Sequence, residues 1–296
     1  MIRSADEIRL ASDEFRLLRD LINHHCGIVL TPEQRPVIER RLRERLTIHG
    51  LHSFGEYHQL LRSSDGRAEL DEAIDIVTVN ETYFYREHHQ LTALQYEIIP
   101  LLRTPPLCRT NISIWSAGCS TGEEVYSVAI AMSEAGLSIG TDVRIFGSDI
   151  SRKCIAHARR GIYGPAAFRT IPAHIKRKYF VEHADGLHVT EEIRPYCHFG
   201  HLNLLDPAKA AVVGRVDIIL CRNVLIYFDD ASRRRAIDML YDRLLPGGFL
   251  LLGHSESLLN VTTAFELVHL RDDLVYRKPM SASRFRAAPK SGSGAP

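Results

Sequence analysis

The segment from Trp115 to Glu124, Trp-Ser-Ala-Gly-Cys-Ser-Thr-Gly-Glu-Glu, constrains the fold of this chain more than any other stretch. Apolar residues at 112, 114 and 115 indicate the end of a buried strand, and those from 125 to 132 recur at helical spacing. The small residues between them let the backbone approach a ligand closely. A strand, a tight turn and a helix N-terminus in this order are typical of a cofactor site at a sheet edge.

Two glutamates at the start of that helix, Glu123 and Glu124, argue against a phosphate ligand. A helix N-terminus binds pyrophosphate through its backbone N–H groups, and two carboxylates there would repel it. They suit hydroxyl groups or a cation instead. The segment therefore favours S-adenosylmethionine, which carries a positive sulfonium and no phosphate, over a dinucleotide.

The composition is that of a globular chain with nearly balanced charge. Of 296 residues, 45% are apolar, enough for one large core or two modest ones. The 37 basic and 36 acidic residues create no global field for nucleic acid. Six cysteines without zinc or redox spacing indicate free thiols. With no signal peptide and no 18-residue apolar run, we expect a cytoplasmic protein that does not insert into membranes.

Two patterns divide the chain. Up to about residue 85 the periodicity is helical, with helices expected near 15–22 and at about 32–49, 53–61 and 68–77. From residue 111 onwards, strands at 112–115, 143–149, 216–221 and 249–252 alternate with helices. This alternation predicts an α/β fold with a doubly wound parallel sheet, whose ligand lies beyond the strand carboxyl ends. An antiparallel hairpin at 265–268 and 274–276 is expected to close the sheet.

The predicted domains follow from these patterns. Residues 1–85 form an N-terminal helical domain, 86–280 the cofactor-binding α/β domain, and 281–296 a disordered tail. Between about 163 and 201 the alternation breaks into short pieces, which we interpret as an inserted helix and a small antiparallel subdomain that includes 196–199.

Polar residues lie beside the expected carboxyl ends of the strands, where they would share one pocket. Asp149 ends the second strand, and its carboxylate suits both hydroxyls of a ribose, although a helix N-cap is the alternative. Asn203 and Leu204 precede the third strand and suit the edge and face of an adenine. Arg222 and Asn223 follow the third strand as a polar pair at the end of an apolar run.

In combination, these features resemble the CheR-type chemotaxis-receptor glutamate methyltransferases, from about Phe15 to Lys278. The most specific motifs are Thr78-Val-Asn-Glu-Thr-Tyr-Phe-Tyr-Arg-Glu87, Ser116-Ala-Gly-Cys-Ser-Thr-Gly-Glu-Glu-Val-Tyr-Ser127, Gly-Ser-Asp149-Ile, Cys221-Arg-Asn-Val-Leu-Ile-Tyr-Phe228, and Pro246-Gly-Gly-Phe with Gly253-His-Ser-Glu256. The resemblance implies an N-terminal helical domain joined to an S-adenosylmethionine-dependent methyltransferase domain. It also implies methyl transfer from S-adenosylmethionine to receptor glutamates, which gives glutamate γ-methyl esters.

The resemblance also implies roles for individual residues. The expected cofactor residues are Asn80, Thr82, Arg86, Glu124, Asp149, Asn203, Leu204, Arg222 and Asn223. Arg86 is the expected partner of a carboxylate, of methionine or substrate, and Tyr227 is expected near the transferred methyl unless it is only a packed aromatic. A glutamate, with a pKa of about 4.3, is already an anionic nucleophile at pH 7, so we interpret His254 as structural or pocket-lining rather than as a general base.

Five arginines crowd the second predicted helix, at 35, 40, 41, 43 and 45. Arg41 and Arg45 flank its apolar stripe, and we expect them to attract the acidic, helical, cytoplasmic methylation region of a receptor. A solvated face balanced by Glu39 and Glu44 is the alternative. In some relatives the inserted subdomain docks a receptor's C-terminal peptide. It looks shorter here, so direct recognition through the arginine helix is favoured; we expect a monomer without a metal site.

Three other classes compete with this interpretation. A nicotinamide-dependent dehydrogenase would have the same sheet but not the two glutamates at the phosphate position. A nucleic-acid methyltransferase would need an Asn/Asp-Pro-Pro-aromatic motif and a basic surface, and the sequence has neither. A non-catalytic module that senses S-adenosylmethionine or docks a receptor would lack some of the cofactor-pocket matches, all of which are retained.

Overall fold

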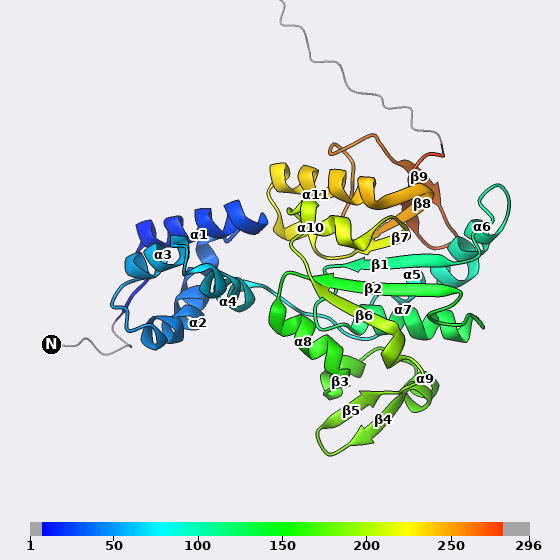
Figure 1. Ribbon diagram of the computed structural model, residues 1–296, viewed down its shortest axis with the longest axis horizontal. Coiled ribbons are helices and arrows are strands. Elements are labelled where there is room, and N and C mark those ends of the chain that lie inside the picture. Colours follow the sequence, from blue (N-terminus) through cyan, green and yellow to red (C-terminus); the bar gives the residue numbers. More distant parts are fainter. Residues whose placement is uncertain (1–7, 281–296) are drawn as a thin grey trace, which may run out of the picture.

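The computed structural model describes residues 8–280, which form a small helical body joined to a larger α/β body (Figure 1). The predicted disordered tail, residues 281–296, and residues 1–7 of the segment considered for a signal peptide lie outside the described residues. All six cysteines are described and unpaired, as predicted.

The N-terminal helices match the predicted periodicity. They are α1 (Ser12–Cys26), α2 (Arg35–Ile48), α3 (Phe54–Arg62) and α4 (Arg67–Val77), with the 3₁₀ turn η2 (Pro32–Gln34) before α2. Gly27 ends α1 in the left-handed conformation at φ 77°, and the Ser53 hydroxyl caps α3 by accepting from Glu56 N–H. The apolar stripes meet in one core in which Leu42 and Phe54 are fully buried.

The α/β domain contains a seven-stranded mixed sheet in the order β6-β2-β1-β7-β8-β10-β9. Its strands are β1 (Ile112–Ala117), β2 (Val143–Asp149), β6 (Cys197–His201), β7 (Val216–Cys221), β8 (Leu244–Leu252), β9 (Glu266–His269) and β10 (Leu274–Arg277). The first five strands of the order are parallel, and β10 and β9 form the predicted antiparallel hairpin. The doubly wound arrangement is therefore confirmed.

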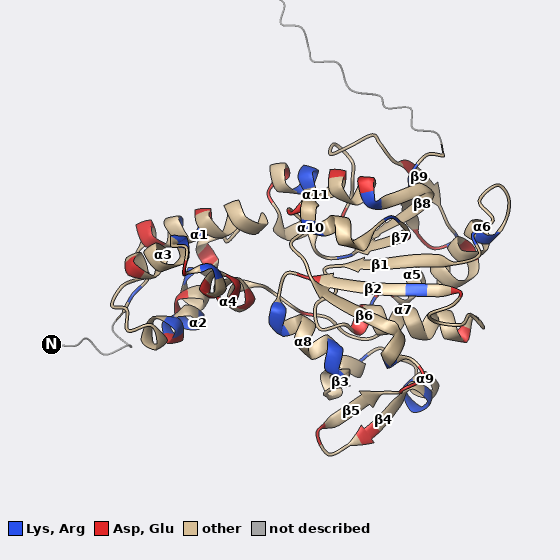
Figure 2. Ribbon diagram, in the orientation of Figure 1, with Lys and Arg blue, Asp and Glu red and all other residues tan. Residues whose placement is uncertain are grey.

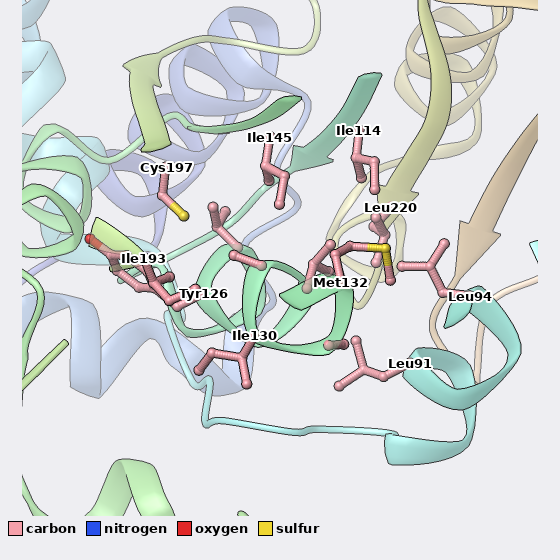
Figure 3. Close-up of a cluster of buried hydrophobic side chains, with 14 of the residues drawn as sticks. Leu91, Leu94, Ile114, Tyr126, Ile130, Met132, Ile145, Ile193, Cys197 and Leu220 are labelled. Atoms are coloured by element: carbon pink, nitrogen blue, oxygen red, sulfur yellow. The ribbon is translucent and has the colours of Figure 1, made fainter. Parts of the chain in front are cut away.

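Helices cover both faces of this sheet (Figure 1). On one face lie α7 (Glu123–Glu134) and α8 (Arg152–Arg160), and on the other lie α10 (Pro207–Ala210) and α11 (Asp230–Arg243). Alternate residues of β1 supply the two cores, because Ile114 packs in the cluster with α7 whereas Trp115 packs in the cluster with α11. Figure 3 shows the first cluster, with Ile114 and Ile145 above Met132 of α7.

Residues 197–201 differ from the prediction, which placed them in the inserted subdomain. They form β6, which pairs in parallel with β2 at the edge of the main sheet. Buried Cys197 and Phe199 flank exposed His198, and a half-exposed edge strand has the same alternation as a strand of a small antiparallel sheet. The pattern alone therefore could not assign β6 to its sheet.

The insert itself is a three-stranded antiparallel sheet in the order β3-β5-β4, as predicted for the rest of that segment. It consists of β3 (Ile162–Tyr163), α9 (Ala173–Tyr179), β4 (Phe180–His183) and β5 (Gly186–Val189), with the 3₁₀ turn η4 (Pro165–Phe168). Its aromatic core, Phe168 and Phe180, packs on Phe84 from the interdomain segment with centroid distances of 5.1 and 4.8 Å.

A helical segment between the two domains was missed by the sequence reasoning. It comprises α5 (His88–Ala93), the π-helical turn η3 (Leu94–Ile98) and α6 (Ile99–Arg103). Leu91 and Leu94 point toward α7 in Figure 3 and belong to the same core cluster. This segment therefore packs in the same core as α7.

Candidate functional site

A cavity lies between the carboxyl ends of the central strands and the helical domain. Residues 26–30 and 77–82 line it from the helical side, and 118–120, 149–150, 202–204 and 222–228 contribute from the α/β domain. It encloses about 1230 Å³, a volume that includes open solvent at its mouth. Every residue expected at the cofactor or the methyl group lines it: Asn80, Thr82, Arg86, Glu124, Asp149, Asn203, Leu204, Arg222, Asn223 and Tyr227.

The turn after β1 brings backbone to the cavity wall. Gly118 has a φ of +86°, and a Cβ there would lie 2.4 Å from Val224 Cγ2. The Ser120 hydroxyl donates to Asn80 O at 3.0 Å, which ties the turn to the interdomain segment. The small residues of the motif thus permit a close approach of three chain segments.

Asp149 ends β2 with its carboxylate at the cavity. Its two oxygens accept the Ser120 and Ser151 N–H groups, each at 2.8 Å. Ser151, not Asp149, is the N-cap of α8, because its hydroxyl accepts from Cys154 N–H at 3.1 Å. Burial raises the pKa of Asp149, and the two N–H donors oppose that rise. Each oxygen keeps lone pairs with which to accept ligand hydroxyls.

A buried guanidinium between two carboxylates forms the floor of the site. Arg222 Nη1 lies 3.1 Å from Glu124 Oε2, and Arg222 Nη2 lies 3.2 Å from Glu87 Oε2. The Ser116 hydroxyl donates to Glu124 Oε1 at 2.6 Å. Burial raises the pKa of Glu124, and the Arg222 charge opposes that rise. Arg222 and Ser116 thus hold the Glu124 carboxylate at the cavity.

Glu123 takes a different position from the one the motif suggested. It is buried and accepts from the Thr121 hydroxyl at 2.7 Å, and it does not line the cavity. Of the two glutamates, Glu124 alone faces the ligand space, because successive residues at a helix start point in different directions.

Arg86 and Tyr227 both line the cavity, Arg86 from the interdomain segment and Tyr227 from the loop after β7. Arg86 Nη1 donates to Glu81 O at 3.0 Å, and the described residues provide no ion-pair partner for it. Its guanidinium is therefore available to a carboxylate. Burial raises the pKa of Tyr227, although the nearby Arg86 charge lowers it, so the phenol keeps its proton at neutral pH.

The two arginines expected to bind a substrate lie outside the cavity, on α2. Arg41 is exposed and donates to Ile76 O at 3.1 Å. Arg45 is held by Glu69, which accepts from its Nε at 2.8 Å and also from its Nη2. Figure 2 shows both signs of charge on α2 and acidic residues on α4. Arg41 and Arg45 therefore do not offer two free guanidinium groups on one surface, because the Arg45 guanidinium is already bound by Glu69.

Sequence reasoning missed two contributors to the site. Residues 28–30, which follow the cap of α1, form part of the cavity wall. Glu256, quoted in a motif without a role, binds the loop after β7. His254 is exposed and lies outside the lining, so the pocket-lining alternative for it is wrong.

Residues 8–280 contain neither a candidate metal site nor a helix that could span a membrane. No group of three or more potential metal ligands lies together there. None of its helices is both long enough and apolar enough to cross a membrane.

Comparisons with known proteins match most of the chain to one family. Two family models match: CheR methyltransferase, all-alpha domain, over residues 13–78, and CheR methyltransferase, SAM binding domain, over residues 80–273. Chemotaxis protein methyltransferase 2 of Vibrio cholerae is 36% identical over 93% of this chain and 96% of its own length. The chemotaxis protein methyltransferase of Borreliella burgdorferi is 35% identical over 85% and 90%, respectively. That of Klebsiella aerogenes is 34% identical over 93% of each chain.

Proposed function

The chain belongs to the CheR methyltransferase family, and from this premise we propose that it methylates glutamate side chains of a chemoreceptor, with S-adenosylmethionine as methyl donor. One observation carries the proposal. A single cavity, walled by both domains, combines a hydroxyl acceptor at Asp149, a carboxylate at Glu124 and the guanidinium of Arg86, which forms no ion pair within residues 8–280. The family predicted from the sequence is confirmed by the two family-model matches and by the relatives.

The residues present fit S-adenosylmethionine. The Asp149 carboxylate suits the ribose hydroxyls, and Leu204 and Asn203 offer an apolar face and a polar edge to the adenine. The Asn223 Oδ1 atom is buried and has no hydrogen-bond partner in the part of the chain that the structure describes, so it offers an acceptor to a ligand N–H or O–H. When bound, S-adenosylmethionine supplies an electrophilic methyl group on a sulfonium.

The protein's contribution to the chemistry is orientation and exclusion of water. The substrate glutamate is already ionised at pH 7, so no residue has to remove a proton. We propose that Arg86 binds a carboxylate, of the methionine moiety or of the substrate, through its guanidinium fork. We propose that Tyr227, which lines the cavity and keeps its phenolic proton, lies near the transferred methyl. Holding two reactants together in this way supplies roughly 7–11 kcal/mol of effective molarity.

For receptor recognition we propose the exposed face of α2 around Arg41, acting on the acidic helical methylation region. Arg45 contributes indirectly, because its ion pair with Glu69 fixes α2 against α4. Arg41→Glu should raise KM for the receptor by about tenfold, or about 1.4 kcal/mol, without changing the Kd of S-adenosylmethionine. An unchanged KM would contradict the role of Arg41. We further propose that the protein acts as a monomer in the cytoplasm, where that region of a receptor lies.

The deciding experiment incubates the protein with methyl-labelled S-adenosylmethionine and a cytoplasmic receptor fragment. Base-labile label on the fragment is expected from the wild type, with strong loss in Arg86→Ala. Arg86→Lys should recover little, because an ammonium keeps the charge but cannot bind a carboxylate through two parallel N–H groups. Arg144→Ala, an exposed arginine of β2 outside the cavity, serves as the control.

Other outcomes separate the alternatives. Calorimetric binding of S-adenosylmethionine without label transfer would favour the non-catalytic sensing or docking module. Absence of binding would overturn the methyltransferase proposal.

A further inference from the structure

We propose that Glu256 is a positioning residue: it holds the loop 222–228, which carries Asn223 and Tyr227 into the cavity, although it does not line the cavity itself. The inference rests on the proposed function, because it concerns the same cavity. Glu256 lies in the segment after β8, three residues beyond Gly253.

The Glu256 carboxylate accepts four backbone hydrogen bonds. Oε2 accepts from Asn223 N–H at 2.7 Å and from Gly253 N–H at 2.8 Å. Oε1 accepts from Val224 N–H at 3.0 Å and from Leu225 N–H at 2.7 Å. An ionised carboxylate has about four acceptor sites, so this one is fully used. Its role is to bind main chain rather than a ligand.

The backbone conformation explains why an anion is needed here. Asn223 is left-handed at φ 58°, and Val224 follows in the right-handed region at φ −116° and ψ −48°. Successive residues of opposite hand turn their N–H groups toward one point and form a concave anion site, or nest. A left-handed residue other than glycine is strained and persists when its surroundings over-determine it. Glu256 provides that constraint.

The loop is anchored at both ends. At its end, Tyr227 O accepts from Val29 N–H at 2.8 Å, so the helical domain holds that side. At its start, Glu256 binds the three consecutive N–H groups after Arg222. Gly253 permits this packing, because a Cβ there would lie 2.8 Å from Asn223 N and 2.9 Å from Glu256 Oε2. Removing the carboxylate would leave the start of the loop without its anchor.

Glu256→Gln tests the inference directly. A glutamine has one acceptor oxygen, and its amide group would face N–H donors, so part of the nest loses its acceptor. We expect kcat at saturating substrates to fall by up to roughly 100-fold, as for other small misplacements of reacting groups. We also expect faster amide hydrogen exchange at residues 223–225.

A stability control separates positioning from general destabilisation. Lys278 Nζ donates to Tyr241 O at 2.7 Å and Leu244 O at 2.8 Å, outside the cavity lining. Lys278→Met should lower the melting temperature but leave kcat of the folded enzyme and exchange at 223–225 unchanged. If its kcat falls in parallel with its stability, a loss of activity in Glu256→Gln would not indicate positioning, and the inference would be overturned.

Gly253→Ala disturbs the same contact, because it adds a Cβ beside Asn223 N and Glu256 Oε2. It is the variant to measure if Glu256→Gln does not fold. It should reproduce the lower kcat and the faster exchange at 223–225. In the double variant the two effects should not add, since both act on one contact.

The outcomes distinguish this inference from the proposed function. A Glu256→Gln protein with wild-type kcat and wild-type exchange at 223–225 would overturn the positioning role. A wild-type protein that transfers no methyl group would instead overturn the proposed function, and the exchange comparison would still decide whether Glu256 holds the loop.

Discussion

At the scale of single residues, two glycines with similar backbone angles differ in what a substitution would disturb. Gly118 and Gly136 have φ values of +86° and +76°, so both occupy the left-handed region. A Cβ at Gly118 would lie 2.4 Å from Val224 Cγ2, in the cavity wall, whereas a Cβ at Gly136 would meet nothing within 4 Å. The surroundings, rather than the angle, therefore decide which glycine affects function.

Gly118→Ala should displace the wall of the cavity and weaken S-adenosylmethionine binding by about tenfold or more, or about 1.4 kcal/mol. The matched variant Gly136→Ala should cost only backbone strain, about 1 kcal/mol of unfolding free energy, with no change in affinity. Titration calorimetry and urea denaturation measure the two quantities. Equal affinities of the two variants would contradict the assigned wall.

At the scale of elements, Glu69 links three helices of the N-terminal domain. From α4 it accepts the bidentate fork of Arg45 on α2, the Tyr57 hydroxyl of α3 at 2.6 Å, and His49 Nε2 at 2.8 Å. Its side chain is only 6% exposed. Burial by itself raises the pKa of Glu69, but the hydrogen bonds from Arg45, Tyr57 and His49 outweigh it and lower the pKa to about 2.

Glu69→Gln should therefore lower the unfolding free energy by about 3 kcal/mol at pH 7, since it leaves the Arg45 charge without its partner. A carboxylate with a depressed pKa stabilises the fold fully above its unfolded pKa of 4.5, and loses that contribution as pH falls toward about 2. The difference in unfolding free energy between wild type and variant should thus be constant above pH 5 and shrink between pH 4.5 and pH 2. Urea denaturation at several pH values measures it.

Glu44→Gln on the exposed side of α2 is the control and should change the unfolding free energy by less than about 0.5 kcal/mol. A Glu69→Gln difference that stays constant down to pH 2 would contradict the assigned pKa direction.

At the scale of the whole molecule, the helical domain is part of the ligand site. Asn23 Nδ2 donates to Asp229 Oδ2 at 2.7 Å, and the linker after α1 pairs with the loop before α11, with Ile28 opposite Phe228. The exposed ion pairs between α4 and α8, such as Arg152 with Asp71, add little, because solvent screens them. The packing of the helical domain against the α/β domain therefore depends mainly on the contacts beside the cavity.

S-adenosylmethionine should accordingly slow amide hydrogen exchange at residues 26–34 and 77–82 as well as in the α/β domain. At 100 times its Kd, binding adds about 2.7 kcal/mol to the stability of every segment that must be folded for binding. The β4–β5 hairpin, which does not line the cavity, is the internal reference. Protection confined to the α/β domain would show that the helical domain does not take part in cofactor binding.

Much of the fold and the cavity was predictable because it depends on local patterns. The caps at Gly27 and Ser53, the bounds of β2 and the residues after each parallel strand follow from periodicity and turn chemistry. Since the carboxyl ends of parallel strands meet at one edge, Asp149 and Asn223 were expected together and do line one cavity. Their binding roles remain predictions.

By itself, the sequence determined the helical and α/β domains, the family motifs and the set of polar residues that meet at the sheet edge. Only the tertiary structure decided that β6 joins the main sheet, that Glu69 holds Arg45 from 24 residues away, and that Glu256 binds the loop after β7. Periodicity reports which face of an element is buried, but not which partner covers it. Those pairings depend on contacts between residues far apart in the chain, and these exist only once the chain has folded.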